Sequence, residues 1–499
     1  MAVPDLVEAF DEFVFNDIPA RFIYIPEMRF MERQEVRNHY APRIELITEK
    51  YIQDKTSIRH RWDISRKDGL NEVVKKVVKY AMFSHRWSNA EPAFQDMTSF
   101  NKKPIESGYT AEPTSPSFLD DKSAGTGHEK LMKFLQKAGS HDCDLAWSDT
   151  CCIDKTSSAE LEEAIRSMFR WYRNSDICIA YLSQSTSVAD FLNEVYFTRA
   201  WTLQELLAPR AMKFYGRDWK FLGAKGGIRE EDKKSRSLKA EIEKVTKIPY
   251  ADISDFRPGT DRVHDKMLWA SQRKATRTED VAYSLIGLFD ITMPIAYGEG
   301  KWAFHRLMEI LMQRCEEWQI FAWAGQSSQY SSGIAESPKS YYPIPIARPS
   351  REHGYIHRGD KLYKSTKRGV KLRLLLVIPC LKQRDNNSWV EVDNHRYNSY
   401  TLGFDSEKST HDGILEELTV RVKDSQVSNS FKVAVGILDY VPVESDASQG
   451  ALIPRRDYVP LLLHADRAGQ SDWKRVPTDK ILAVSCRKHI QCSLTTVWL

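Results

Sequence analysis

The stretch DLAWSDTCCIDKTSSAELEEAIRSMFRWYRNSDICIAYLS, residues 144–183, decides the fold. An apolar run of strand length stands at each end, and the residues between them have helical periodicity. Ser157 and Glu160 have the spacing of a capping box, which predicts where this helix begins. A strand, a helix and a second strand in this order predict a right-handed crossover within a parallel sheet.

The neighbouring segments continue the same alternation. Apolar runs of strand length lie at Lys79–His85 and Ala211–Gly216, and helical stretches lie at His128–Ala138 and Arg199–Pro209. The sequence therefore predicts an α/β fold with an open, doubly wound, mostly parallel sheet. Ligands of such sheets bind beyond the carboxyl ends of the strands, so the loops that leave those ends are candidate sites.

The whole chain divides into four predicted regions. Residues 1–78 form an N-terminal extension that packs on the α/β core, and the core consists of residues 79–225. Residues 226–330 form a helical subdomain, and residues 331–499, with many short strands at regular spacing, form a mostly β C-terminal domain. Within the core, the Pro-, Ser- and Gly-rich connection Ser88–Gly127 is predicted to be mobile.

Composition narrows the classes of protein and partner. The chain has 499 residues, of which 42% are hydrophobic and 28% charged, as in folded globular proteins. The net charge of +4 is too small over this length to indicate a nucleic-acid partner. The first residues, MAVPDLVEAFDEFVF, carry acids where a secretory signal carries positive charge, and no apolar run is long enough to span a membrane. We therefore predict a cytoplasmic protein.

The eight cysteines include the adjacent pair Cys151 and Cys152 but no paired C-x-x-C sets. This pattern predicts reduced, buried thiols and neither a disulfide scaffold nor a metal site. A cysteine close to a helix N-terminus can become nucleophilic, but packing as a small apolar group is the simpler interpretation. We expect no bound metal and no resident cofactor.

The third predicted helix carries a candidate catalytic acid. Glu205 lies four residues after Trp201, so both project from one face near the start of that helix. A carboxylate beside an aromatic ring makes a plausible subsite. The alternative is that Trp201 belongs to the core and that Glu205 is solvated or paired with Arg199 or Arg210.

Two further loops supply candidate ligand contacts. Ser84, Arg86 and Trp87 follow the first strand, where an arginine and backbone amides are able to meet a phosphate. Asp149 and Asp154 flank the cysteine pair after the second strand. A capping loop would use the same residues. There is neither a G-x-S-x-G nucleophile elbow nor a G-x-x-x-x-G-K phosphate loop, and the YGEG run at Tyr297 has too few glycines to indicate one.

Taken together, the motifs resemble the fungal heterokaryon-incompatibility (HET) domain. The resemblance covers about Tyr80 to Gly325 and rests on YAMFSHRW at Tyr80, GHEKL at Gly127, the block Trp147 to Leu182, FTRAWTLQELLAPR at Phe197, FYGRDW at Phe214, TRTEDVAYSLIGLFDI at Thr276, MPIAYGEG at Met293 and IFAWAG at Ile320. It implies a role in programmed cell death after non-self recognition.

HET domains in turn resemble the Toll/interleukin-1 receptor (TIR) domain, which has a flavodoxin-like order of elements. Its W-C-x-x-E motif matches Trp201, Thr202 and Glu205, with threonine in place of cysteine. In enzymatic TIR domains this glutamate serves cleavage of the nicotinamide–ribose bond of NAD. The resemblance therefore implies an NAD glycohydrolase with Glu205 as catalytic carboxylate, and Ser84, Arg86, Trp87, Asp149, Asp154 and Trp201 as residues that contact NAD.

A second function class stays open. TIR-like domains also act without catalysis, by self-association or by binding another protein. Under that interpretation the same motifs stabilise the fold and an assembly surface. The C-terminal strands are predicted to form a regulatory or partner-binding domain.

Overall fold

The structure is a computed structural model and describes residues 3–57, 65–88, 90–100, 126–223, 232, 235–342, 363–366, 369–392, 395–403, 415, 418–423, 432–443, 445–465 and 472–499. Most of the connection predicted to be mobile lies outside these residues. The chain forms two compact units: unit 1 is Met1–Pro258 with Tyr283–Leu288, and unit 2 is Gly259–Ala282 with Phe289–Leu499. The boundaries of the four predicted regions stay predictions.

A six-stranded sheet forms the centre of unit 1, in the order β2-β1-β4-β3-β5-β6. Its strands are β1 (Arg21–Tyr24), β2 (Arg29–Glu32), β3 (Tyr80–His85), β4 (Leu145–Trp147), β5 (Ile177–Tyr181) and β6 (Met212–Tyr215). β3 runs parallel to β4 and β5, and β5 runs parallel to β6. After β3 the chain adds β4 on one side of it and then β5 and β6 on the other side. The strand order therefore reverses between β3 and β5. The predicted α/β class with a parallel sheet is confirmed.

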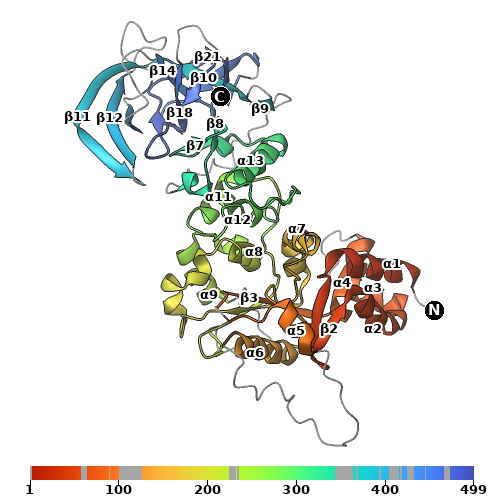
Figure 1. Cartoon of the computed structure of the whole chain (residues 1–499). Helices are drawn as coiled ribbons and strands as arrows, with labels where there is room; N and C mark the ends of the chain where they lie inside the picture. The colour runs from red at the N-terminus through yellow and green to blue at the C-terminus, as the bar shows by residue number, and fades with distance from the viewer. Residues whose placement is uncertain are drawn as a thin grey trace, which may run out of the picture. The chain divides into compact units, whose positions relative to one another are not determined.

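Helices cover both faces of the parallel strands. Figure 1 shows α6 (Thr126–Ser140) on one side of β3, and α7 (Ser158–Asn174) and α8 (Thr202–Leu207) on the other. Side chains of a strand alternate between faces. Phe83 accordingly stacks on Phe134 of α6 with ring centroids 4.3 Å apart, whereas the Tyr80 hydroxyl donates to the Trp171 carbonyl of α7 at 2.6 Å.

The N-terminal region adds to the sheet itself, which the sequence did not indicate. β1 pairs antiparallel with both β2 and β4, so the hairpin extends the sheet at the β4 edge. Its helices are α1 (Pro4–Glu12), a π-helical turn (Phe13–Asp17), α2 (Arg33–Glu45), α3 (Glu49–Ser57) and α4 (Arg66–Val77). The region therefore completes the central sheet as well as packing on it.

The third predicted helix is shorter than expected. In place of a helix over Arg199–Pro209, α8 covers only Thr202–Leu207, and 3-10 turns at Val188–Asn193 and Val195–Thr198 precede it. Arg199 is extended, with φ −84° and ψ 142°, because the Thr202 hydroxyl donates to the Tyr196 carbonyl and, at 3.1 Å, to the Arg199 carbonyl. These bonds separate the 3-10 turn Val195–Thr198 from α8.

Helix α7 begins where the sequence predicted, since the Ser157 hydroxyl accepts from the Glu160 backbone N–H at 3.3 Å. The other described helices of unit 1 are α5 (Phe94–Phe100), α9 (Arg236–Thr246) and α10 (Tyr250–Ser254). Segment Tyr283–Leu288 packs on α7 at Gly287, where an added Cβ would lie 2.3 Å from that of Phe169. Only glycine permits this close approach.

Unit 2 joins helices to a mostly β region. Its helical elements are α11 (Val263–Ser271), most of α12 (Asp280–Tyr283), α13 (Trp302–Arg314) and the 3-10 turns Trp318–Phe321 and Pro338–Tyr341. Its strands are β7 (Ser327–Ser328), β8 (Ser331–Ala335), β9 (Tyr363–Thr366), β10 (Gly369–Val377), β11 (Cys380–Val392), β12 (His395–Gly403), β13 (Leu418–Lys423), β14 (Lys432–Ile437), β15 (Val441–Pro442), β16 (Gln449–Leu452), β17 (Asp457–Tyr458), β18 (Pro460–Ala465), β19 (Lys474–Arg475), β20 (Val484–Ser485), β21 (Ile490–Ser493) and β22 (Thr495–Trp498). The prediction that the C-terminal region is mostly β is confirmed.

A buried arginine joins the two parts of unit 2. Arg475 on β19 donates to the carbonyls of Phe321 (2.7 Å) and Trp323, and its guanidinium lies 3.5 Å from the centroid of the Trp323 ring. Burial lowers the pKa of Arg475 to about 9. Backbone carbonyls and an aromatic face thus stabilise this charge.

Candidate functional site

Three buried side chains meet beside the carboxyl end of β3, next to the point where the strand order reverses. The Ser84 hydroxyl, near the end of β3, donates to Glu205 Oε2 on α8 at 2.6 Å. The Tyr196 hydroxyl lies 2.8 Å from Ser84 Oγ. Glu205 is 6% exposed, and Ser84 and Tyr196 are fully buried. We call Ser84, Tyr196 and Glu205 the Glu205 cluster.

The direction of the hydrogen bonds in the Glu205 cluster follows from the proton inventory. A serine hydroxyl has one proton, which Ser84 gives to Glu205, so Tyr196 donates to Ser84 Oγ. Tyr172 of α7 lies close by, since its hydroxyl donates to the Phe83 carbonyl at 2.7 Å. Burial, and then the negative charge of Glu205, raise the pKa of Tyr172 well above its ordinary value. Glu205 thus accepts from a serine hydroxyl and lies near a tyrosine whose phenol stays protonated.

Ser84 and His85 do not form a catalytic dyad, because neighbours on a strand point to opposite faces. The His85 ring stacks on Phe83 at 4.0 Å and its Nε2 lies 3.8 Å from Glu91 Oε2. Burial, followed by the charge of Lys130, lowers the pKa of His85 well below its ordinary value. A Ser-His-acid hydrolase at this strand is therefore excluded by geometry.

A second contact joins the two predicted loops. The Trp87 indole N–H donates to Asp149 Oδ2 at 2.9 Å, and Lys155 Nζ lies 3.9 Å from the centroid of the Trp87 ring. Trp87 is 43% exposed. Burial raises the pKa of Asp149, and the Lys155 charge and the Trp87 bond oppose that rise. The structure thus brings Trp87 and Asp149 together at an exposed aromatic ring.

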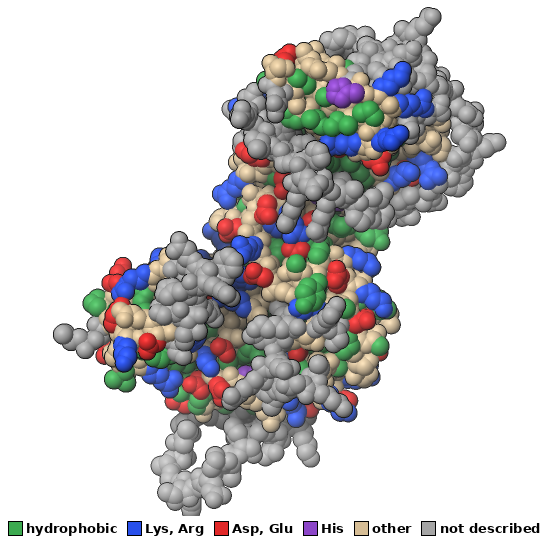
Figure 2. Space-filling view, turned by 180° about the vertical axis from the view of Figure 1, so that it is seen from behind, with side chains coloured by type: hydrophobic (Ala, Val, Ile, Leu, Met, Phe, Trp, Pro, Cys, Tyr) green, Lys and Arg blue, Asp and Glu red, His purple; other side chains and the backbone are tan. Residues whose placement is uncertain are grey.

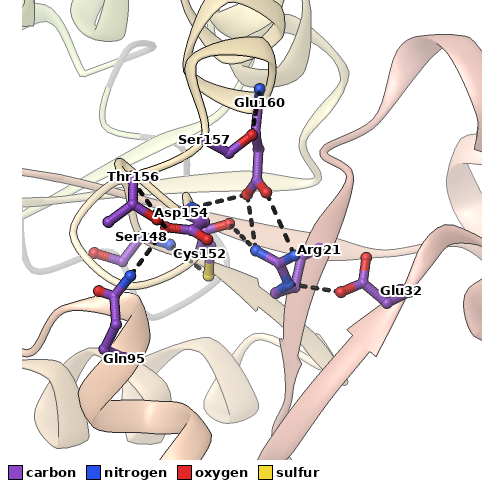
Figure 3. A network of polar contacts seen from close by, with 9 residues as sticks. All are labelled: Arg21, Glu32, Gln95, Ser148, Cys152, Asp154, Thr156, Ser157 and Glu160. Carbon is purple, nitrogen blue, oxygen red and sulfur yellow. Dashed lines mark hydrogen bonds and ion pairs between the residues drawn. The ribbon is translucent and has the colours of Figure 1, made fainter.

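Asp154 serves the loop itself. Figure 3 shows its carboxylate turned toward Thr156 and Gln95, and it accepts from the Thr156 hydroxyl at 2.6 Å and from Gln95 Nε2 at 2.9 Å. These bonds, with that from the Thr156 hydroxyl first, lower the pKa of Asp154. Its backbone N–H donates to Glu160, which Arg21 of β1 also contacts at 2.8 Å. The network fixes the loop between β4 and α7 against the N-terminal hairpin.

The remaining predicted residues do not join the Glu205 cluster. Arg86 is exposed, and its carbonyl accepts from Lys130 Nζ at 3.1 Å. Trp201 is half-buried at the N-cap of α8, one residue before the helix. The seven predicted site residues therefore fall into the Ser84–Glu205 pair, the Trp87–Asp149 pair and three separate positions.

The adjacent cysteines pack as apolar groups. Cys151 and Cys152 are both buried and not in disulfides. The Cys152 contact and burial raise the pKa of Cys151 well above its ordinary value, so its thiol stays protonated. Among the described residues no group of three His, Cys, Asp or Glu side chains is placed to hold a metal ion.

The YGEG loop of unit 2 surrounds a carboxylate of the chain. Glu279 Oε1 accepts from the backbone N–H groups of Gly298 at 2.8 Å and Gly300 at 3.0 Å. Both glycines have positive φ, at 102° and 58°, which explains their residue type. The pKa of Glu279 is lowered, first by its own backbone N–H and then by those of Gly300 and Gly298. The amides that a phosphate would need are therefore already used.

Reasoning from the sequence missed Tyr196 and Tyr172. Tyr196 lies in a 3-10 turn, where no regular periodicity marks a residue as facing the site. Tyr172 is one of the buried residues of α7, where helical periodicity indicates a core residue and no more. The hydroxyl groups at both positions distinguish them from plain core residues, because a buried phenol requires a hydrogen-bond partner.

Surface charge and hydropathy add two findings. On the face drawn in Figure 2, lysine and arginine side chains are interspersed with aspartate and glutamate over the described surface. Within the described part of the chain, no helix is long and apolar enough to cross a membrane.

Comparison with known proteins agrees with the predicted resemblance. Residues 80–192 match the family described as Heterokaryon incompatibility protein (HET). Over 251 residues the chain is 37% identical to the vegetative incompatibility protein HET-E-1 of Podospora anserina. The resemblance to fungal HET domains is thus confirmed.

The similarity covers only part of each chain. The aligned part is 47% of this chain, which spans only 16% of the length of HET-E-1. No solved structure matches the chain. Ser84, Trp87 and Asp149 lie inside the residues that match the family, whereas Tyr196 and Glu205 come after them.

Proposed function

We propose that this protein is a cytoplasmic effector of heterokaryon incompatibility that triggers cell death by cleaving the nicotinamide–ribose bond of NAD, with Glu205 as catalytic carboxylate. The observation that carries the proposal is the 2.6 Å bond from the Ser84 hydroxyl to Glu205 inside the buried Glu205 cluster. The family match at residues 80–192 and the name of the relative, a vegetative incompatibility protein, support the biological role.

The place of the cluster supports a TIR-like fold and site. Among the four parallel strands the spatial order is second, first, third, fourth, the order of flavodoxin-like sheets. Ligands of such sheets bind at the point where the order reverses, which here is between β3 and β5. Ser84 on β3 and Glu205 on α8 meet at that point, and Trp201, Thr202 and Glu205 match the TIR motif apart from the threonine.

The chemistry requires a carboxylate that is held but accessible to substrate. When the C1′–N1 bond of NAD breaks, its electron pair neutralises the pyridinium ring and nicotinamide leaves. The ribose becomes oxocarbenium-like, water adds to C1′, and the water releases a proton. Glu205 would orient the ribose hydroxyls and stabilise the positive charge, since a fixed carboxylate in a low-dielectric site acts strongly on developing charge. Ser84 is able to rotate its hydroxyl away and free Oε2 for the ribose.

The other predicted contacts keep secondary roles in this proposal. The exposed Trp87 ring, oriented by its bond to Asp149, would stack on a flat ring of NAD. Arg86, whose side chain is exposed, would meet the phosphates, and Trp201 would border the ribose. Asp154 would act indirectly, by fixing the loop that carries Asp149.

The test is nicotinamide release from NAD by the purified full chain at high concentration, because self-association is part of the proposal. Glu205→Gln should lower turnover by at least about 100-fold, within the usual range for loss of a group that stabilises developing charge. The matched control is Asp232→Asn, a carboxylate of unit 1 that is 2% exposed and accepts from the Phe214 backbone N–H at 2.8 Å. Asp232→Asn should keep its turnover per folded molecule. No turnover by the natural sequence would overturn the proposal.

A second candidate function is a non-catalytic module that acts by self-association or by binding a partner protein. The observation in its favour is the burial of the Glu205 cluster, in which Glu205 already has a hydroxyl donor. Under this alternative Glu205→Gln leaves toxicity in cells intact. Under the enzymatic proposal the same substitution abolishes toxicity while the protein stays folded.

A further inference from the structure

Unit 2 contains a large polar hollow that the proposed function does not use. Its volume is about 1290 Å³, above the roughly 300–1,000 Å³ of most small-ligand pockets. One wall is α13, through Trp302, His305 and Glu309, and another is the β7–β8 hairpin with Tyr330. Two tryptophans also line the hollow: Trp473, just before β19, and Trp498, at the end of β22. Parts of β9 and β10 complete the lining.

Uncharged hydrogen-bonding groups dominate the lining. Hydroxyl and amide side chains are contributed by Gln326, Ser327, Ser328, Gln329, Ser331, Ser332, Ser365 and Thr366. Each hydroxyl both donates and accepts, and each amide does the same through separate atoms. Such a surface is suited to a ligand that itself carries many groups able to donate and accept.

The charges in the hollow argue against an anionic ligand. Two lysines, Lys301 and Lys474, stand beside three carboxylates, those of Glu309, Glu336 and Asp472, and two histidines, His305 and His464, also line the hollow. Lys301 is moreover paired with Glu336 at 2.5 Å. Phosphate and nucleotide sites instead gather arginine, lysine or free backbone amides. A neutral ligand therefore fits this lining better than a phosphorylated one.

His305 adds no positive charge to the hollow. It is buried, its Nδ1 lies 3.0 Å from Ser328 Oγ, and its Nε2 lies 3.7 Å from Glu309 Oε1. Burial lowers its pKa, so the ring is neutral at physiological pH. The groups that face this ring from the elements around it are Ser328, Glu309, Trp302 and Tyr330.

Aromatic rings contribute a flat face to the lining of the hollow. The Trp302 ring stacks on His305 at 4.7 Å, which holds it in place. Tyr330 meets Trp302 edge to face, at 4.4 Å and 81°, and is 45% exposed. An exposed aromatic face beside neutral hydroxyl and amide groups matches both surfaces of a sugar ring, whose C–H face is apolar and whose edge carries hydroxyls.

We propose that this hollow of unit 2 binds a neutral oligosaccharide, with the exposed Tyr330 ring stacking on a sugar ring and the serine-rich β7–β8 hairpin contacting its hydroxyls. The size of the hollow favours several sugar units over one. The site is independent of Glu205, because every residue that lines it belongs to unit 2.

The test is isothermal titration of the full chain with cellotriose, laminaritriose, chitotriose and mannotriose, followed by tryptophan fluorescence for any sugar that binds. Tyr330→Ala should weaken binding about tenfold, as expected for loss of one aromatic contact. The matched control is Tyr342→Ala, since Tyr342 is 47% exposed in the same unit but does not line the hollow. It should bind as the natural sequence does.

A second variant tests the site with a substitution that should leave the fold intact. Ser332→Ala, at a half-buried position on β8, removes one hydroxyl with little loss of packing and should weaken binding by a few-fold. Binding of inorganic phosphate or ATP in the hollow with no response to any of the four sugars would overturn the proposal. Sugar binding that is equal in Tyr330→Ala and Tyr342→Ala would overturn it as well.

Discussion

Two buried glutamates, one in each unit, are held in different ways. Glu205 is 6% exposed and Glu279 is 7% exposed, so burial alone does not distinguish them. Glu279 accepts from backbone N–H groups whose positions the chain fixes, whereas Glu205 accepts from the hydroxyl of Ser84, which is able to rotate. The fixed amide donors mark Glu279 as a structural carboxylate, whereas under the proposed function the rotatable donor of Glu205 lets that carboxylate exchange partners.

The largest expected difference is in stability after truncation. Glu279→Ala leaves the Gly298 and Gly300 amides without their acceptor, which should lower the free energy of unfolding by about 3 kcal/mol. Glu205→Ala should cost less, about 1 kcal/mol, because it removes the acceptor of one side-chain hydroxyl, that of Ser84. Chemical unfolding followed by circular dichroism measures both. Equal losses would contradict the comparison.

The glycines of the YGEG loop provide a second test of how Glu279 is held. Gly298 has φ of 102° and Gly300 has φ of 58°. Gly298→Ala should cost about 2 kcal/mol, because an L residue is strained in that conformation and the amide that holds Glu279 would shift. Gly300→Ala, in the left-handed helical region, should cost about 1 kcal/mol. Thermal unfolding of the two variants measures which substitution destabilises the protein more. A larger loss for Gly300→Ala than for Gly298→Ala would contradict the prediction that the Gly298 amide is the more important contact of Glu279.

Substitution of Ser84 tests the proposed catalytic role of the Glu205 cluster. Ser84→Ala removes the hydroxyl that positions Glu205 before substrate binds and should lower NAD turnover about tenfold, which corresponds to about 1.4 kcal/mol in the barrier. Tyr196→Phe, which removes only the outer donor, should have a smaller effect. Steady-state kinetics on both variants tests this order. A Ser84→Ala protein with unchanged turnover would separate Ser84 from the chemistry.

The smallest expected effect is a pH dependence of stability. Because the folded state lowers the pKa of Glu279 from 4.5, its contribution is present above that pH and is lost as the pH falls through the folded value. The stability gap between the natural sequence and Glu279→Gln should therefore shrink in acid. Unfolding curves at a series of pH values measure the gap. A gap that widens in acid would mean that the anchoring amides do not hold an ionised carboxylate.

Local patterns predicted much of unit 1. The bounds of the buried strands β3 and β6 were predicted to within one residue, because an apolar run is visible without knowledge of its partners. The capping box at Ser157 marked the start of α7 for the same reason. By contrast, the pairing of β1 with β4 joins residues more than a hundred positions apart, and no local pattern specifies it.

The candidate site was predicted only in part. Position at a strand end singled out Ser84, and the resemblance to TIR domains singled out Glu205, but neither indicated that the two touch. That contact depends on which face of the sheet α8 covers, a property of the whole fold. Tyr196 was missed because it lies in an irregular turn. The short α8 was mispredicted because the Thr202 hydroxyl bonds compete with the helix.

The most direct test of the central claim measures NAD turnover and chemical unfolding on the same preparations of Glu205→Gln and Glu279→Gln. We expect Glu205→Gln to stay as stable as the natural sequence within about 1 kcal/mol and to lose its turnover. We expect Glu279→Gln to be clearly less stable and to keep its turnover per folded molecule. A Glu205→Gln protein that is strongly destabilised while its folded fraction still cleaves NAD would contradict the claim and assign Glu205 a structural role.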